Sequence, residues 1–138
     1  NIRLRVIGRR EGLSEKMQKA AREAEERTKN NTRGLLQLAV NYGGHAEITD
    51  AVRAIVKEGI APEAIDDETV IKHLYAPDVP PPDFIIRTSG EQRLSGFLTW
   101  QSAYSELYFT PVHWPAFSEI DLDAAFAWYA DRNQRYGK

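Results

Sequence analysis

One stretch of the 138-residue sequence gathers side chains that bind anions. Arg87 and Arg93 stand six residues apart, and the Ser95 hydroxyl follows them, among the small residues Gly90 and Gly96. A guanidinium can donate two parallel hydrogen bonds to a phosphate, and such charge-assisted bonds are roughly twice as strong as neutral ones. Glycine lets backbone N–H groups approach an anion, and Ser95 stands where a helix with a partly positive amino end could begin. The stretch is therefore a candidate diphosphate site.

The same arginines also have an ordinary explanation. They could pair with Glu91 or Glu106 in a surface network, and the residue types alone do not decide between the two interpretations. Glu106 is unusual because its neighbours along the chain are apolar or aromatic, and a buried carboxylate needs a cation or a hydrogen-bond partner. Its partner would be a guanidinium, in a structural salt bridge, or Mg²⁺, which binds one or two carboxylates together with phosphate oxygens.

The hydrophobic pattern predicts which elements position these side chains. Apolar residues alternate with arginines at Ile2–Ile7, which predicts a strand, and the nearly continuous apolar run Leu35–Val40 predicts a strand buried on both faces. Two short strands are predicted at residues 83–87 and 106–109. Helices are predicted at residues 14–29 with Ser14 as N-cap, between Gly44 and Gly59, at 66–74, at 97–104, and from a Ser118/Asp121 cap to Gly137.

Strands that alternate with helices indicate an α/β fold, with a mostly parallel sheet flanked by helices. Ligands in such folds bind beyond the carboxyl ends of the strands. The polar loops Asn41–His45 and Arg87–Ser95 both fall there. Four short strands are too few to bury Leu35–Val40 on both faces, so the sequence predicts a part of a larger sheet.

Composition excludes several classes of protein. The formal net charge of −2 does not favour a nucleic-acid partner, and the absence of cysteine excludes disulfides, thiolate zinc sites and a cysteine nucleophile. No apolar run reaches the roughly 18 residues of a membrane span. The opening residues lack the pattern of a signal peptide. His45, His73 and His113 are scattered without metal-ligand spacing. We expect a cytoplasmic protein that binds no nucleic acid.

Longer motifs match a known family. The run Asp83–Gln101, continuing through Ala103–Phe109, closely resembles the signature of cis-prenyltransferases, whose best-known members are the bacterial undecaprenyl diphosphate synthases. Upstream, Asn31-Thr32 and Ala39–Gly44 are similar to the strand that precedes this signature, and Arg135-Tyr136-Gly137 is similar to the family's terminal Arg-x-Gly motif. The motifs follow in order over essentially the whole chain.

The resemblance implies a fold, a reaction and roles for residues. It implies the cis-prenyltransferase fold and a Mg²⁺-dependent condensation of isopentenyl diphosphate with an allylic diphosphate, giving a polyprenyl diphosphate such as the undecaprenyl product. It also implies a homodimer that contacts the membrane transiently through its lipid product. By position, Arg87, Arg93 and Ser95, with the Leu94 backbone, match the isopentenyl diphosphate site, Glu106 matches the metal-associated glutamate, and Arg135 and Gly137 match a segment that reaches the partner's site.

The resemblance covers only the C-terminal portion of the family's single domain. The family enzyme is nearly twice as long, and its catalytic aspartate lies in the portion that precedes the matched region. No residue among 1–138 matches that aspartate, so we expect this segment alone to be inactive. The chain also departs from the family at Arg9, where an aspartate is common, at Gly34, where a leucine is common, and at His45, where an arginine is usual.

Two other interpretations remain open at this point. A non-catalytic regulatory subunit of a two-component cis-prenyltransferase would keep the terminal Arg-x-Gly motif, but such subunits tend to lose the isopentenyl-binding arginines. The presence of Arg87, Arg93, Ser95 and Glu106 counts against it. An unrelated phosphate-binding α/β module is the other alternative.

Overall fold

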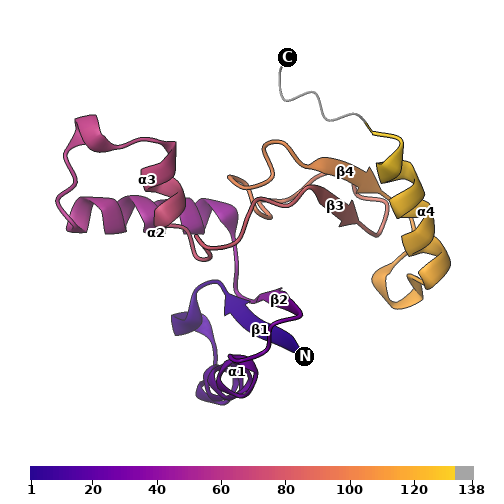
Figure 1. Ribbon diagram of the computed structural model, residues 1–138, viewed down its shortest axis with the longest axis horizontal. Coiled ribbons are helices and arrows are strands. Elements are labelled where there is room, and N and C mark those ends of the chain that lie inside the picture. Colours follow the sequence, from indigo (N-terminus) through magenta and orange to yellow (C-terminus); the bar gives the residue numbers. More distant parts are fainter. Residues whose placement is uncertain (133–138) are drawn as a thin grey trace. The chain divides into compact units, whose positions relative to one another are not determined.

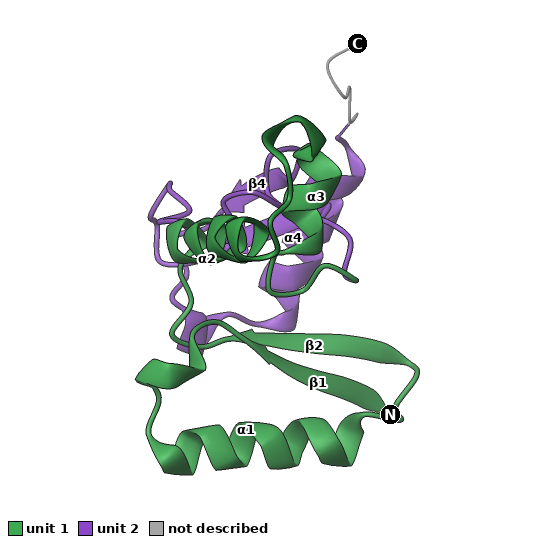
Figure 2. Ribbon diagram, turned by 90° about the vertical axis from the view of Figure 1, so that its left-hand side faces the viewer, with its two compact units in different colours: residues 1–78 green, residues 79–138 purple. Residues whose placement is uncertain are grey.

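The computed structural model describes residues 1–132, which form two compact units (Figures 1 and 2). Unit 1 comprises residues 1–78 and unit 2 begins at Val79. Each unit contains one pair of parallel strands. The predicted α/β class with parallel strands is confirmed. The four described strands form two pairs, β1 with β2 in unit 1 and β3 with β4 in unit 2.

Unit 1 opens with β1 (Ile2–Ile7), α1 (Glu15–Thr28) and β2 (Gly34–Ala39). The two strands pair in parallel, in a register that runs from Ile2 opposite Gly34 to Ile7 opposite Ala39. The α1 helix runs alongside β1 (Figure 2). It begins where the sequence predicts, because the Ser14 hydroxyl accepts a hydrogen bond from Met17 N–H.

Side chains from the α1 region occupy the outer edge of β1, the edge that faces away from β2. Four hydrogen bonds join these side chains to the β1 backbone. Asn31 Nδ2 donates to Ile2 O (2.8 Å), and an Arg10 guanidinium nitrogen donates to Val6 O (3.1 Å). Leu4 N–H donates to Thr28 Oγ1 (3.0 Å), and Val6 N–H donates to Glu25 Oε1 (2.8 Å). Most of the outward backbone groups of β1 are therefore satisfied without another strand.

The prediction that Leu35–Val40 is buried on both faces is wrong for this chain. Leu35, Leu36 and Leu38 are 36%, 49% and 41% exposed, and they alternate between the two faces of β2. Within the described residues β2 has one neighbouring strand, β1. The apolar side chains of β2 are therefore only partly covered within residues 1–132.

Unit 1 continues with α2 (Gly44–Lys57) and α3 (Asp67–Lys72). Both were predicted, and Asp66 caps α3 by accepting from Thr69 N–H at 2.8 Å. The two helices pack through a small apolar core that contains Ile55 and Leu74. This packing fixes the segment that follows α3.

Unit 2 contains β3 (Phe84–Arg87), β4 (Glu106–Phe109) and α4 (Glu119–Ala130). The strands are parallel, with Phe84 opposite Glu106 and Arg87 opposite Phe109. The Phe84 ring stacks on Tyr129, at 4.8 Å between ring centroids, so α4 packs against the β3–β4 pair. The predicted Ser118/Asp121 cap is present as a capping box. The helix ends at Ala130, earlier than the predicted end at Gly137.

The predicted helix at residues 97–104 is wrong. Residues 95–104 form a series of turns. Ser95, Gly96 and Leu98 have φ angles of 51°, 78° and 47°, in the left-handed region, which interrupts a right-handed helical repeat. Among the described residues, no helix is both long and apolar enough to cross a membrane.

Candidate functional site

Arg87 lies at the carboxyl end of β3, where ligands of parallel sheets bind. Its backbone carbonyl accepts from Thr110 N–H at 2.9 Å, which fixes the strand end. The side chain is half-buried, yet within residues 1–132 its guanidinium forms no hydrogen bond or ion pair. A guanidinium held in this way remains available to an anion.

The loop after β3 is fixed by its backbone. Ser89 N–H donates to Val112 O and Gly90 N–H donates to Thr110 O, both at 2.9 Å. The Gly90 N–H is therefore already bonded within the chain, and any backbone N–H that meets an anion here belongs to another residue of the loop. Both residues have positive φ angles, 74° and 75°. The backbone gives the loop its shape, and the side chains remain for ligand binding.

The second arginine lies farther along this loop. Arg93 is exposed and forms an ion pair with the Glu91 carboxylate, which is the surface pairing that the sequence left open. The Leu94 carbonyl accepts from Phe97 N–H at 2.9 Å, and Ser95 is exposed. An exposed ion pair contributes only about 0–1 kcal/mol, so a diphosphate could displace Glu91 from Arg93.

Glu106 is the first residue of β4, and the register places it at the other end of the strand pair from Arg87. Three residues of about 3.3 Å each separate the two positions along the strands. Glu106 is half-buried and forms no ion pair in the part of the chain that the structure describes, so the structural salt bridge is not formed there. The structure does not bring Glu106 and Arg87 into contact.

The described chain does not gather a complete set of protein ligands for a metal ion. No group of three or more histidine, aspartate and glutamate side chains that could hold a metal occurs in residues 1–132. A lone, unpaired carboxylate such as Glu106 fits Mg²⁺, since this ion takes one or two protein carboxylates and completes its shell with phosphate oxygens and water. The predicted Arg135 and Gly137 lie outside the described residues.

A second polar cluster lies in unit 1 and was not predicted as a site. Two carboxylates on one face of α2, Glu47 and Asp50, are its centre. Glu47 is only 1% exposed and accepts from Tyr42 OH (2.5 Å) and Tyr75 N–H (2.9 Å). Asp50 accepts two bonds from Arg9, both at 2.8 Å, and one from Tyr75 OH at 2.7 Å.

These contacts perturb the ionisation of the cluster. The Arg9 guanidinium, with a smaller effect from Tyr75 OH, lowers the pKa of Asp50 to about 2. Partial burial, together with the bond to Asp50, raises the pKa of Tyr75 to about 12. The cluster therefore keeps a carboxylate, a guanidinium and a neutral phenol together at neutral pH. The sequence feature that could have indicated this cluster is the i, i+3 spacing of Glu47 and Asp50 after the Gly-Gly pair, which places both carboxylates on one face of a helix.

The cluster ties together the loops that follow β1 and β2. Asn41 Nδ2 donates to Arg9 O at 2.8 Å, and Arg9 N–H donates to Asn41 O at 3.2 Å. At Gly8, with φ of 117°, a Cβ atom would lie 2.2 Å from Val40 O. The contact excludes any side chain there.

His45 is exposed in the first turn of α2.

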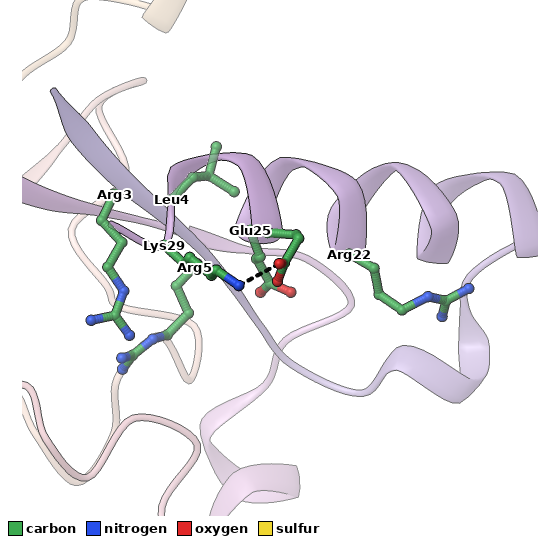
Figure 3. A pocket seen from close by; sticks show the side chains of 7 residues that line it. Arg3, Leu4, Arg5, Arg22, Glu25 and Lys29 are labelled. Atoms are coloured by element: carbon green, nitrogen blue, oxygen red, sulfur yellow. Dashed lines mark hydrogen bonds and ion pairs between the residues drawn. The ribbon is translucent and has the colours of Figure 1, made fainter. Parts of the chain in front are cut away.

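A hollow of about 530 Å³ between β1 and α1 is lined mainly by charged side chains (Figure 3). Four cations line it, Arg3, Arg5, Arg22 and Lys29, and two of them form ion pairs with carboxylates. Arg5 forms a two-bond pair with Asp78 (2.5 and 2.7 Å), and Lys29 pairs with Glu26 at 2.5 Å. Arg3 and Arg22 form no ion pair within residues 1–132, so part of the positive charge of the hollow is not neutralised.

The fold corresponds to that of solved diphosphate synthases. The structure of lavandulyl diphosphate synthase from Lavandula x intermedia, in complex with dimethylallyl diphosphate, is 40% identical and superposes with a TM-score of 0.93, covering 99% of this chain and 61% of that one. Residues 1–137 match the model of the prenyltransferase family described as "Putative undecaprenyl diphosphate synthase". The chain belongs to this family, as its motifs predicted.

Curated relatives carry corresponding names. Isoprenyl transferase 2 of Bradyrhizobium diazoefficiens is 49% identical over 140 residues, covering 99% of this chain and 56% of the relative. Isoprenyl transferase of Thermotoga maritima is 51% identical over 138 residues, covering 99% of this chain and 59% of the relative. The chain spans less than two thirds of the length of these relatives.

Proposed function

We propose that residues 1–138 are the C-terminal portion of one cis-prenyltransferase domain and supply its isopentenyl diphosphate site. The observation that carries this proposal is the unpaired guanidinium of Arg87, held at a strand end in the loop that also presents Arg93 and Ser95. Two guanidiniums and a hydroxyl match the charge and the oxygen-rich surface of a diphosphate. The names of the relatives support a transfer of isoprenyl groups.

The complete domain would join isopentenyl diphosphate to an allylic diphosphate. A carbon–carbon bond forms between the two prenyl units, a proton leaves the isopentenyl unit, and diphosphate leaves the allylic unit. The chain's own residues hold the isopentenyl diphosphate so that its double bond faces the allylic carbon, and this positioning lowers the barrier. Repetition gives a polyprenyl diphosphate, for which we propose the undecaprenyl length.

Magnesium is part of the proposal. Glu106 would supply one carboxylate oxygen to Mg²⁺, and phosphate oxygens and water would supply the other ligands. When bound, the ion neutralises the negative charge that develops on the departing diphosphate. Within this chain, Arg87 and Arg93 provide further positive charge for the diphosphate that remains bound.

The assembly and location follow the family's pattern in this proposal. We propose a cytoplasmic homodimer in which Arg135 and Gly137 reach the partner's site, with transient contact between the lipid product and a membrane. Sedimentation of a family-length protein that contains these residues tests the dimer. Monomeric protein with full condensation activity would contradict it.

Substitution of the arginines tests the function. In a family-length protein, Arg87→Ala and Arg93→Ala should each raise KM for isopentenyl diphosphate by tens to about a hundredfold, since a hydrogen bond to a charged group contributes about 1.5–3 kcal/mol. Lys16→Ala, on the exposed face of α1, is the matched control and should leave KM unchanged. The 138-residue segment alone should show no condensation.

Each opposing outcome identifies a different alternative. If both arginine variants bind isopentenyl diphosphate as tightly as the unsubstituted protein, the site is a scaffold, as expected of a non-catalytic regulatory subunit. Binding of other phosphorylated metabolites without any response to isopentenyl diphosphate indicates an unrelated phosphate-binding module. Condensation by the 138-residue segment alone contradicts the proposal that it lacks an essential half of the site.

A further inference from the structure

The hollow between β1 and α1 gathers positive charge that its carboxylates do not balance (Figure 3). Its charged lining residues are four cations and two carboxylates: Arg3, Arg5, Arg22, Lys29, Glu25 and Glu26. The surplus follows from the sequence, since residues 1–33 contain ten Lys and Arg but only five Asp and Glu. Every lining residue belongs to unit 1, so the hollow is defined within that unit alone.

Arg3 has no carboxylate of its own because its neighbour Arg5 occupies the one nearby. The two arginines are two residues apart on β1, so their side chains leave the same face of the strand, about 7 Å apart. Both carboxylate oxygens of Asp78 accept from Arg5, at 2.5 and 2.7 Å. These bonds lower the pKa of Asp78 to about 2, and the charge of Arg3 adds to the shift, so Arg3 also lies near this carboxylate. Within residues 1–132 the Arg3 guanidinium forms no hydrogen bond or ion pair.

Arg22 on α1 is unpaired for a similar reason. Its neighbours at i+3 and i+4 on the helix are Glu25 and Glu26, at the spacing where ion pairs usually form. Glu25 Oε1 instead accepts from Arg10 at 2.7 Å, and Glu26 pairs with Lys29 at 2.5 Å. Both carboxylates are engaged elsewhere, so Arg22 forms no ion pair in the described part of the chain.

The size and lining of the hollow indicate the kind of ligand. Its volume of about 530 Å³ lies within the range of about 300–1,000 Å³ for small-molecule sites, but its lining is charged where most such sites are apolar. A guanidinium binds phosphate oxygens through two parallel hydrogen bonds, and two unpaired guanidiniums match the charge of a phosphate dianion. Exposed carboxylates, Glu23 and Glu26, lie beside Arg22 on α1 and would repel a long polyanion such as nucleic acid.

We infer that the hollow between β1 and α1 is a binding site for a phosphate group, which Arg3 and Arg22 hold and Arg5 borders. The same contacts suit a phosphate or diphosphate that is free in solution and one that is carried by an anionic lipid. The site uses none of the residues of the loop after β3, so the inference does not depend on the proposed function.

Titration with inorganic diphosphate, followed by NMR of the arginine Nε–H groups, tests the site in a family-length protein that contains residues 1–138. The Arg3 and Arg22 signals should shift together and saturate. Arg3→Gln and Arg22→Gln should each weaken binding at the hollow by about tenfold or more, as expected when a bond to a charged group is lost. Arg27→Gln is the matched control, because it removes the same charge from the exposed face of α1 but does not line the hollow. Unshifted signals, or equal losses in all three variants, would overturn the inference.

Removal of a competing carboxylate tests the site in the opposite direction. Glu26→Gln releases Lys29 and removes a negative charge from the lining, so the affinity for diphosphate should rise by about threefold. Glu23→Gln removes the same charge from the same helix, but Glu23 pairs with Lys19 and does not line the hollow, so its effect should be smaller. Equal affinities of these two variants would count against the inference.

Vesicles identify the source of the phosphate. If the protein binds inorganic diphosphate at Arg3 and Arg22 but does not sediment with vesicles of phosphatidylcholine and phosphatidic acid, the ligand is free in solution. Sedimentation that Arg3→Gln and Arg22→Gln abolish and Arg27→Gln does not would identify a lipid headgroup. Either result supports the site, and the absence of both would overturn it.

Condensation assays separate this site from the proposed function. Arg3→Gln should leave KM for isopentenyl diphosphate unchanged, and Arg87→Ala should leave the response of the Arg3 and Arg22 signals unchanged. A protein that shows this response but does not condense isopentenyl diphosphate would refute the proposed function and leave the hollow as a site. If Arg3→Gln raises KM as much as Arg87→Ala, the hollow belongs to the isopentenyl diphosphate site and the inference is overturned.

Discussion

The hydrogen bond from Tyr75 OH to Asp50 offers a test of the cluster that joins the loops of unit 1. It is 2.7 Å long and links α2 to the segment after α3. Tyr75→Phe removes this bond but keeps the Tyr75 backbone bond to Glu47 and the edge-to-face contact with the Tyr42 ring. Asp50→Ala removes the acceptor. The two substitutions form a double-mutant cycle around one bond.

The expected magnitude follows from the pKa of Asp50. A decrease from 3.8 to about 2 corresponds to about 2.4 kcal/mol at 1.36 kcal/mol per unit. Water screens part of this energy, because the Asp50 side chain is 30% exposed. We therefore expect Asp50→Ala to lower the free energy of unfolding by about 1–2 kcal/mol and Tyr75→Phe by about 1 kcal/mol, with a coupling energy of about 1 kcal/mol.

Urea denaturation followed by far-ultraviolet circular dichroism measures these values. Because the pKa of Asp50 is lower in the folded state, its stabilisation is complete above about pH 4 and is lost as the pH falls towards 2. Asp50→Ala should reduce this acid sensitivity. Tyr42→Phe, which removes a bond to Glu47 and not to Asp50, is the control and should be additive with Asp50→Ala within about 0.5 kcal/mol. If the coupling energy between Tyr75 and Asp50 is also within about 0.5 kcal/mol, the bond between them does not contribute as we expect.

Three further outcomes are expected. Gly8→Ala should cost more than about 2 kcal/mol in urea unfolding, since its Cβ would meet Val40 O at 2.2 Å at a φ of 117°; an unchanged midpoint would contradict this contact. His73 Nδ1–H donates to Thr69 O and the ring pairs with Glu58, and both contacts raise the pKa of His73. Stability should therefore fall as the pH rises above about 6.5, and His73→Gln should remove that dependence in a pH series of thermal melts. Ser118→Ala should cost about 1 kcal/mol of α4 stability, measured by tryptophan fluorescence in urea, and Ser118→Thr should restore most of it.

Local signals in the sequence predicted most elements correctly. The caps at Ser14 and Ser118 each depend on residues three positions away, and those bonds form as predicted. The prediction of a helix at 97–104 is wrong because the spacing of aromatic residues does not determine backbone φ angles. Leu98 adopts a left-handed conformation, which is not expected for a leucine. Burial of Leu35–Val40 fails for a different reason, since burial depends on neighbours that residues 1–132 do not supply.

The sequence predicted which residues belong to the candidate site but not the contacts between them. The sequence placed Arg87 at a strand end, which the structure confirms. It could not show that Gly90 N–H is bonded to Thr110 O, because that contact joins residues twenty positions apart. The same holds for the bond between Glu47 and Tyr75, which are 28 positions apart. Long-range pairing is set by tertiary packing, and no local pattern encodes it.

The bonds that hold the loop after β3 have a consequence for the entropy of binding. Ser89 and Gly90 are fixed to Val112 and Thr110 before any ligand arrives. A diphosphate that binds there would immobilise the side chains of Arg87 and Arg93, at about 0.5–1.5 kcal/mol for each, but would not need to order the backbone of the loop. The conformational entropy of the loop backbone is thus lost when the protein folds and not when a ligand binds. Substitutions that stiffen the flanking turns should therefore change the affinity for a diphosphate little.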